Sequence, residues 1–172
     1  MPELLDPKEI LEKLNLKEDM IAADFGSGSG GWAIPLAKIL DKGKVFAIDI
    51  QSAPLSVLEG RAKIEKVSNI VKILADVEKP LLNFPKNCCD LVLMTDLLFQ
   101  VEDKEAVFEN AKMALKEKGK VLVVDWKENS NLGPKDKKVN PEEIKKIAQN
   151  IGFSFLKEIP AGSYHFCLLF EK

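Results

Sequence analysis

The chain has 172 residues, of which 46% are hydrophobic and 30% are charged, and its formal net charge is −2. These values predict one ordinary globular domain over residues 1–172, with enough apolar residues for a sizeable core. They argue against a nucleic-acid-binding protein with a strongly basic footprint, and no apolar run reaches the ~20 residues that span a bilayer.

Helix and strand signals alternate along the chain. Asp6 before Pro7 and Asn140 before Pro141 predict helix starts, because a short polar side chain caps a helix whose first position is proline. Ser52 is expected to cap a further helix. The predicted helices lie within residues 4–16, 31–40, 52–67, 104–117 and 140–152, and the predicted strands lie within residues 20–25, 44–50, 69–75, 88–98, 119–126, 153–159 and 163–172.

The order of these elements predicts an α/β fold. Continuous apolar strands that alternate with helices are typical of a parallel sheet covered on both faces. About four residues separate the last two strands, which is too short for a parallel crossover, so these strands form a hairpin. We therefore expect a Rossmann-like, seven-stranded, mostly parallel sheet with an antiparallel last strand. The long segment Lys127–Val139 fits a mobile lid and a plain surface loop equally well.

A glycine-rich loop, ADFGSGSGG, joins the first predicted strand to the next helix. Glycine allows positive φ and a close approach to a ligand, and the helix N-terminus offers N–H groups to an anion. Gly26, Gly28 and Gly31 fit the G-x-G-x-x-G pattern of dinucleotide-binding proteins, whereas Asp24, Gly26, Gly28 and Gly30 fit an acidic-x-G-x-G-x-G pattern. The Asp24 carboxylate would repel a pyrophosphate but would tolerate a ligand with a positive amine and a sulfonium. A glycine turn without a ligand is the third, disfavoured interpretation.

Aspartates end the next four strands of the predicted parallel sheet. Ligands of open α/β sheets bind outside the carboxyl ends of the strands, so these side chains point at one edge. Asp49 can accept both hydroxyls of a ribose there, and Asp76 could accept a hydrogen bond from an adenine amino group. Singly, each aspartate fits a turn or a helix cap equally well. The full series is Asp49, Asp76, Asp96 and Asp125.

The sequence resembles the class I S-adenosylmethionine-dependent methyltransferases over nearly the whole chain. ADFGSGSGG resembles the first family motif, VFAIDI the second, ILADV the third, CDLVLMTDLLFQV the fourth and ALKEKGKVLVVDW the fifth. The closing hairpin matches the reversed last strand of the family. The order and spacing of these motifs make the resemblance more specific than the glycines alone. The chain is most similar to the methyltransferase-domain type, near the ubiquinone-biosynthesis group.

The resemblance implies S-adenosylmethionine as methyl donor and S-adenosylhomocysteine as product. It implies that Asp49 binds the ribose with Ile50 beside the adenine, and that Asp76 binds the adenine amine with Val77 supplying a backbone donor. No metal site is implied. The residues implied to surround the methionine part are Asp24, Phe25, Gly26, Ser27, Gly28, Gly30, Thr95 and Asp96.

Three features depart from the family pattern. Pro35 falls inside the expected helix after the glycine loop and should kink or shorten it. Gln100 stands where many relatives have a histidine pair. The TDLL sequence after the fourth strand lacks the Asn/Asp-Pro-Pro-aromatic motif of enzymes that methylate exocyclic base amines, so nucleic acid is an unexpected acceptor.

The expected acceptor is a small molecule, because the short chain leaves one helix and one long loop to build its pocket. Displacement at a sulfonium mainly requires alignment of the acceptor and exclusion of water, and a base only where the acceptor loses a proton. Asp96 and His165 are the catalytic candidates, since both are expected at the ligand edge. A solvent-facing or locally packed edge-strand histidine is the alternative for His165, and Asp125 could also serve the acceptor.

Two other functions stay open on the sequence alone. An NAD-dependent oxidoreductase is supported by the dinucleotide pattern and Asp49 but opposed by Asp24, Asp76 and the terminal hairpin. A non-catalytic partner subunit would keep the fold and bind the cofactor without turnover. No signal peptide is evident, and Cys88, Cys89 and Cys167 lack metal-ligand spacing, which favours reduced thiols in the cytoplasm. A monomer or a homodimer is expected.

Overall fold

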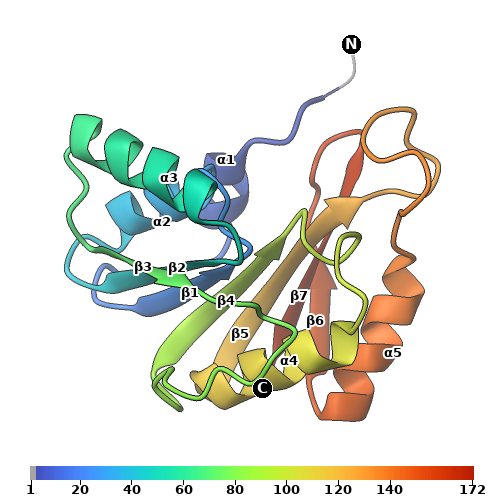
Figure 1. Cartoon of the computed structure of the whole chain (residues 1–172). Coiled ribbons are helices and arrows are strands. Elements are labelled where there is room, and N and C mark those ends of the chain that lie inside the picture. The colour runs from blue at the N-terminus through green and yellow to red at the C-terminus, as the bar shows by residue number, and fades with distance from the viewer. Residues whose placement is uncertain (1–2) are drawn as a thin grey trace.

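A computed structural model describes residues 3–172 of the chain (Figure 1). The strands of this part form one sheet in the order β3-β2-β1-β4-β5-β7-β6. Strands β1 to β5 pair in parallel, and β7 is antiparallel to both β5 and β6. The predicted Rossmann-like sheet with an antiparallel last strand is confirmed. The strands are β1 (Ile21–Phe25), β2 (Lys44–Asp49), β3 (Ile70–Leu74), β4 (Cys89–Thr95), β5 (Leu115–Trp126), β6 (Ser154–Glu158) and β7 (His165–Glu171).

Helices cover both faces of the sheet, as predicted (Figure 1). On one face lie α1 (Pro7–Glu12), α2 (Ala33–Ile39) and α3 (Ser52–Ile64). On the other lie α4 (Lys104–Ala114) and α5 (Pro141–Ile151). Each group of helices packs on its own buried apolar cluster. Because successive side chains of a strand point to opposite faces of the sheet, the central strands β1, β4 and β5 contribute to both clusters.

Two of the three predicted helix caps form. The Asp6 side chain accepts a hydrogen bond from the Lys8 backbone at 2.9 Å, and Asn140 accepts one from Glu142 at 2.8 Å. The predicted Ser52 cap is wrong, because α3 already begins at Ser52 and Gln51 is its capping residue. The Asp49 carboxylate accepts the N–H of Gln51 at 2.9 Å, while the Gln51 side chain makes no capping hydrogen bond.

Element boundaries differ from prediction where the chain turns sharply. Strand β4 ends at Thr95 because Asp96 has a φ of +49° and leaves the strand. Helix α4 ends at Ala114, and β5 begins at the next residue. Helix α2 begins at Ala33, which puts Pro35 in its first turn, where a missing N–H breaks no helical bond. The helix is shorter than the expected range 31–40, which agrees with the shortening expected from the proline.

The carboxyl ends of the parallel strands share one edge with the turn between β6 and β7. The register pairs Trp126, the last residue of β5, with His165, the first residue of β7. The N-terminal segment reaches the same turn, because Glu3 exchanges two hydrogen bonds with Ser163, of 2.9 and 3.0 Å. In residues 3–172, no helix is both long and apolar enough to cross a membrane.

Candidate active site

A cavity of about 380 Å³ lies at the carboxyl ends of β1, β2 and β3. Residues from the segment after β4 close its other side, among them Leu97, Gln100 and Val101. The cavity is thus built between a strand edge and a turn, which is where open α/β sheets bind ligands. It brings together the predicted residues Gly26, Gly28, Asp49, Ile50, Asp76 and Val77.

The glycine loop has positive φ at Gly26, Gly28 and Gly30, with values of +72°, +52° and +88°. A Cβ on Gly30 would lie 2.9 Å from Leu58 Cγ, whereas one on Gly28 would have no neighbour within 4 Å. Gly31 has neither a positive φ nor a close neighbour. The backbone therefore requires glycine in the acidic-x-G-x-G-x-G pattern and not at the third glycine of the dinucleotide pattern.

Strand β2 holds this loop in place. The backbone N–H groups of Gly26 and Ser27 both donate to the Ile48 carbonyl, at 2.8 and 2.9 Å. The Asp49 carboxylate accepts the Gly28 N–H at 2.8 Å and the Gln51 N–H at 2.9 Å. Asp49 is half-buried, so one carboxylate both fixes the loop and faces the cavity.

Asp76 forms the far end of the cavity. Its carboxylate accepts the Glu78 N–H at 2.9 Å, and Glu78 in turn accepts the N–H groups of Glu102 and Asp103, at 2.8 and 2.7 Å. These bonds tie the segment after β4 to the segment after β3. Leu97, Gln100 and Val101 could not be predicted as lining residues, because no local motif marks side chains that reach the cavity through the turn at Asp96.

Buried polar atoms without a hydrogen-bond partner among residues 3–172 occur in four residues. Such atoms are costly to leave unsatisfied, so a cluster of them marks a place that suits a polar ligand. They are the two carboxylate oxygens of Asp24, Ser27 Oγ, Asp96 Oδ1 and both ring nitrogens of His165. Asp24 and Ser27 flank the end of β1, Asp96 follows β4, and His165 begins β7, so all four belong to the carboxyl edge of the sheet.

Asp24 is fully buried beneath the glycine loop. Burial is the main cause that raises its pKa to about 8, and the neighbouring Asp49 carboxylate raises it further against a smaller lowering by the Ala33 N–H. An aspartate held this way is protonated near neutral pH unless a cation lies beside it. Asp24 does not line the cavity of about 380 Å³ but lies behind the loop that does.

Asp96 and His165 meet at the same edge. His165 Nε2 lies 3.3 Å from Asp96 Oδ1, and the His165 side chain is 8% exposed. The solvent-facing alternative for this histidine is therefore wrong, since its ring is packed inside. The Trp126 ring lies against it, with the ring centroids 4.0 Å apart.

The Asp125 side chain binds backbone N–H groups and is not free to contact a ligand. Its side chain is fully buried, and its two oxygens accept the N–H groups of Trp126 and Phe99, at 2.8 and 3.3 Å. Burial raises the pKa of Asp125 to about 6, and the Trp126 hydrogen bond partly offsets the rise. The expectation that Asp125 could serve the acceptor does not fit this arrangement.

Three other predicted residues lie away from the cavity. The Phe25 side chain is fully buried in the cluster beneath α4 and α5. Gly30 is covered by Leu58 and Ile34. Thr95 is buried at the end of β4 and does not line the cavity.

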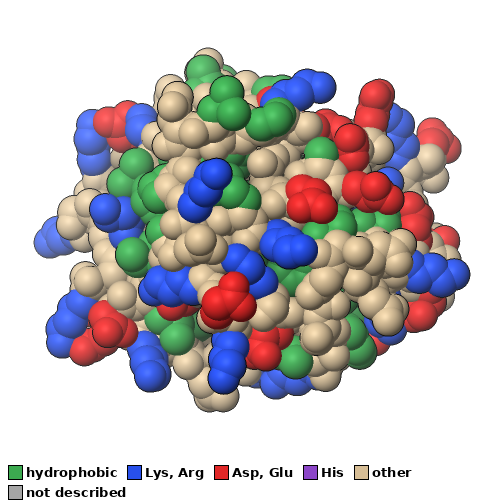
Figure 2. All heavy atoms as spheres, turned by 90° about the horizontal axis from the view of Figure 1, so that it is seen from below, with side chains coloured by type: hydrophobic (Ala, Val, Ile, Leu, Met, Phe, Trp, Pro, Cys, Tyr) green, Lys and Arg blue, Asp and Glu red, His purple; other side chains and the backbone are tan. Residues whose placement is uncertain are grey.

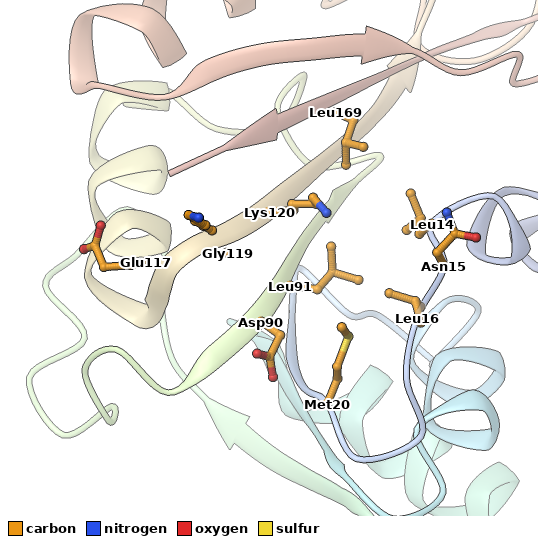
Figure 3. Close-up of a pocket in the computed structure, with 11 residues that line it drawn as sticks. Leu14, Asn15, Leu16, Met20, Asp90, Leu91, Glu117, Gly119, Lys120 and Leu169 are labelled. Atoms are coloured by element: carbon orange, nitrogen blue, oxygen red, sulfur yellow. The ribbon is translucent and has the colours of Figure 1, made fainter.

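A second cavity, of about 190 Å³, opens at the amino ends of the strands (Figure 3). Leu14, Met20 and Leu91 form apolar wall there, while Asp90 and Lys120 add charge. None of the predicted site residues lines it. In the view from below, which shows this end of the molecule, acidic and basic side chains are interspersed (Figure 2).

A seven-stranded sheet with a reversed last strand, and a glycine loop beside carboxylates at the ends of β2 and β3, define a class of Rossmann-like proteins that bind nucleosides at the sheet edge. Residues 16–159 match the family model described as a methyltransferase domain. The chain belongs to this family of S-adenosylmethionine-dependent methyltransferases, as its motifs predicted.

Known relatives agree with this assignment. Phosphoethanolamine N-methyltransferase 1 of Arabidopsis thaliana is 32% identical over 119 residues, which are 69% of this chain and 23% of that protein. A ubiquinone/menaquinone biosynthesis C-methyltransferase of Shewanella oneidensis is 31% identical over 120 residues, which are 67% of this chain and 46% of that protein. The chain thus spans between about a quarter and about a half of these curated relatives.

Among solved structures, a SAM-dependent methyltransferase from Aquifex aeolicus superimposes with a TM-score of 0.88 at 26% identity. The match covers 98% of this chain and 90% of that one, so the whole sheet and its helices are shared. Together, the matches favour S-adenosylmethionine over a nicotinamide dinucleotide as the ligand of the glycine loop.

Proposed function

We propose that this chain binds S-adenosylmethionine beside the glycine loop and transfers its methyl group to a small-molecule acceptor next to Asp96 and His165. The observation that carries the proposal is the gathering of buried, unpartnered polar atoms at one edge of the sheet. The same edge adjoins the cavity that holds Asp49 and Asp76. A ligand with ammonium and hydroxyl groups would satisfy these atoms.

The residues at this edge fit the nucleoside part of the donor. Asp49 is half-buried at the end of β2, where its carboxylate can accept the ribose hydroxyls while it keeps the Gly28 N–H. Asp76 and the backbone of Val77 suit the adenine amine and ring, and the exposed Ile50 side chain suits the adenine face. Gly28, with open space around it, lets backbone approach the ligand closely.

The remaining unpartnered groups fit the methionine part. Asp24 and Ser27 offer a carboxylate and a hydroxyl beneath the loop, where a ligand ammonium would hold Asp24 ionised. Asp96 and the backbone of Gly26 complete the proposed surround, and Phe25, Gly30 and Thr95 support it from behind the cavity wall. When bound, the donor supplies an electrophilic methyl group on a positively charged sulfur.

The pair Asp96 and His165 is proposed to handle the proton of the acceptor. A carboxylate 3.3 Å from Nε2 favours the imidazole form that carries a proton on this nitrogen, which leaves Nδ1 to accept one. The buried position of the ring excludes water from the proton transfer. An acceptor whose nucleophile carries a removable proton, such as an amine or a hydroxyl, suits this arrangement.

The relatives support a small acceptor, since the printed names of two of them refer to phosphoethanolamine and to ubiquinone or menaquinone biosynthesis. Nucleic acid is not part of the proposal. We also propose a single domain over residues 1–172, a cytoplasmic location and a monomeric or homodimeric state. The free state of Cys88, Cys89 and Cys167 supports the reducing compartment.

Calorimetric titration with S-adenosylmethionine, S-adenosylhomocysteine and NAD, run in parallel, tests the donor. Binding of the first two without NAD is the expected result, and binding of NAD alone would overturn the proposal. A panel of amines, phenols and other hydroxyl compounds, with S-adenosylhomocysteine formation as the readout, then tests transfer. Donor binding without turnover on any acceptor would favour the non-catalytic partner subunit.

A further inference from the structure

The Trp126 ring packs against the proposed catalytic histidine. Trp126 and His165 are directly opposite each other in the antiparallel pair of β5 and β7, so their side chains share one face of the sheet. Their ring centroids are 4.0 Å apart with an angle of 42° between the planes. This face also carries Asp24 and Thr95, because the side chains of β1 and β4 alternate in the same way.

The loop from Lys127 to Val139 returns to cover the same indole. Gly133, in the middle of the loop, has a φ of +84°, and a Cβ on it would lie 2.9 Å from Trp126 Cε2 and would overlap the ring. Only a glycine lets the loop backbone come this close. Lys127 ties the start of the loop to the β6–β7 turn, through its N–H to Tyr164 O at 2.9 Å and its Nζ to Gly162 O at 3.1 Å.

Hydrogen bonds do not fix the orientation of His165. Both ring nitrogens lack a hydrogen-bond partner among residues 3–172, and the 3.3 Å approach to Asp96 is longer than the ~2.7–2.9 Å of a charge-assisted bond. Packing therefore decides where the ring points, and the aromatic ring that packs against it is that of Trp126.

We propose that Trp126 is a positioning residue that holds His165 against Asp96. Gly133 packs on the Trp126 ring, so the loop Lys127–Val139 acts as a lid on the acceptor side. The proposal rests on the proposed role of His165 as the base. Loop closure and histidine alignment are then one event, because the same indole contacts both. Carboxylates on this side of the sheet include Asp96, which lies 3.3 Å from His165 Nε2, and Asp24, which lies on the same face. Asp125 points to the opposite face, and Lys127 Nζ donates to the Gly162 carbonyl.

The single histidine of the chain gives a direct readout of ring position. Imidazole nitrogen and carbon NMR spectra report its tautomer and titration without donor or acceptor. We expect Trp126→Ala and Gly133→Ala to change both, and Trp126→Phe to retain most of the wild-type spectrum because it keeps a ring to pack against. Gly60→Ala is the matched control, since a Cβ on Gly60 meets nothing within 4 Å.

Turnover supplies the second readout. With an acceptor from the screen, Trp126→Ala and Gly133→Ala should lower kcat about tenfold or more and shift its pH profile, since small misalignments of a catalytic group are costly. Donor affinity should stay within about twofold of wild type, because the residues that line the donor cavity do not include Trp126 or Gly133.

Unchanged imidazole spectra in a folded Trp126→Ala variant would overturn the proposal, whatever the activity. If that variant does not fold, Gly133→Ala decides, because the substitution lies in an exposed loop. Failure of wild-type protein to bind the donor would instead refute the proposed function, and the spectra would still report whether Trp126 positions the ring.

Discussion

The Asp49 carboxylate accepts the Gly28 N–H at 2.8 Å, so the acid that ends β2 and the glycine loop that follows β1 form one unit. The same carboxylate also accepts the Gln51 N–H, at the start of α3. A residue proposed to bind the ribose therefore also shapes the loop that approaches the rest of the ligand. A substitution of Asp49 is therefore expected to affect both the ribose contact and the shape of the glycine loop.

Asp49→Ala is expected to weaken the binding of S-adenosylmethionine by at least ~1 kcal/mol, or about fivefold, because it removes a charged hydrogen-bond acceptor. Calorimetric titration with the donor and with S-adenosylhomocysteine measures the loss. Asp41→Ala, at an exposed acid in the turn before β2, is the control and should bind as the wild type does. Equal affinities of all three proteins would remove the ribose assignment.

Neighbouring glycines should respond differently to alanine. Gly30→Ala combines a φ of +88° with a Cβ 2.9 Å from Leu58 Cγ, so we expect a loss of about 2 kcal/mol or more in the free energy of unfolding. Gly31→Ala should stay within about 0.5 kcal/mol of wild type. Urea denaturation of the two variants checks this. A Gly31→Ala loss as large as that of Gly30→Ala would contradict the loop geometry.

Stability should depend on pH through Asp24. Its folded-state pKa of about 8 lies above the value of about 3.9 expected in the unfolded chain, so the folded protein binds more protons between these values. The free energy of unfolding therefore falls as the pH rises from about 4 to about 8, by up to ~1.4 kcal/mol per pH unit.

The comparison of wild type with Asp24→Asn isolates this effect. The variant should lack the decline between pH 6 and pH 8, since its amide does not titrate, while Asp125 contributes only below its own pKa of about 6. Urea denaturation across the pH range measures both slopes. Asp41→Asn controls for the loss of an exposed acid, and parallel slopes for wild type and Asp24→Asn would refute the raised pKa.

His165→Gln should separate catalysis from donor binding. We expect kcat to fall by about 10²–10⁴, the usual contribution of a general base, with donor affinity unchanged. Asp96→Asn should lower kcat as well, and any loss of donor affinity in that variant would show that Asp96 also holds the donor amine. Steady-state kinetics with a screened acceptor and calorimetry on the same samples give the two quantities. A His165→Gln enzyme with wild-type kcat would exclude the histidine as base.

The sheet and one side of its cavity could be predicted because both follow from local rules. Apolar strands alternating with helices imply a parallel sheet, and strands of a parallel sheet end at one edge, so Asp49 and Asp76 could be assigned to one site. The short link before the last strand implied its reversed direction.

The acceptor side could not be predicted in the same way, because it depends on contacts between distant segments. Leu97 and Gln100 face the cavity only because Asp96 turns with a φ of +49°. The packing of Trp126 against His165 depends on the register of β5 and β7. The packing of the loop on the Trp126 ring depends on the position of Gly133. The predicted cap at Ser52 is one residue too late, because α3 begins at Ser52 and Gln51 precedes it.

The hydrogen bonds between Glu3 and Ser163 have a practical side for protein engineering. They hold the N-terminal segment against the turn that leads into His165, so a purification tag or fusion partner ahead of residue 3 would start beside this turn. The C-terminal Lys172 lies at the other end of β7, where its Nζ donates to the Leu115 carbonyl at 2.6 Å (Figure 1). Tags, immobilisation linkers and fluorescent labels are best attached there.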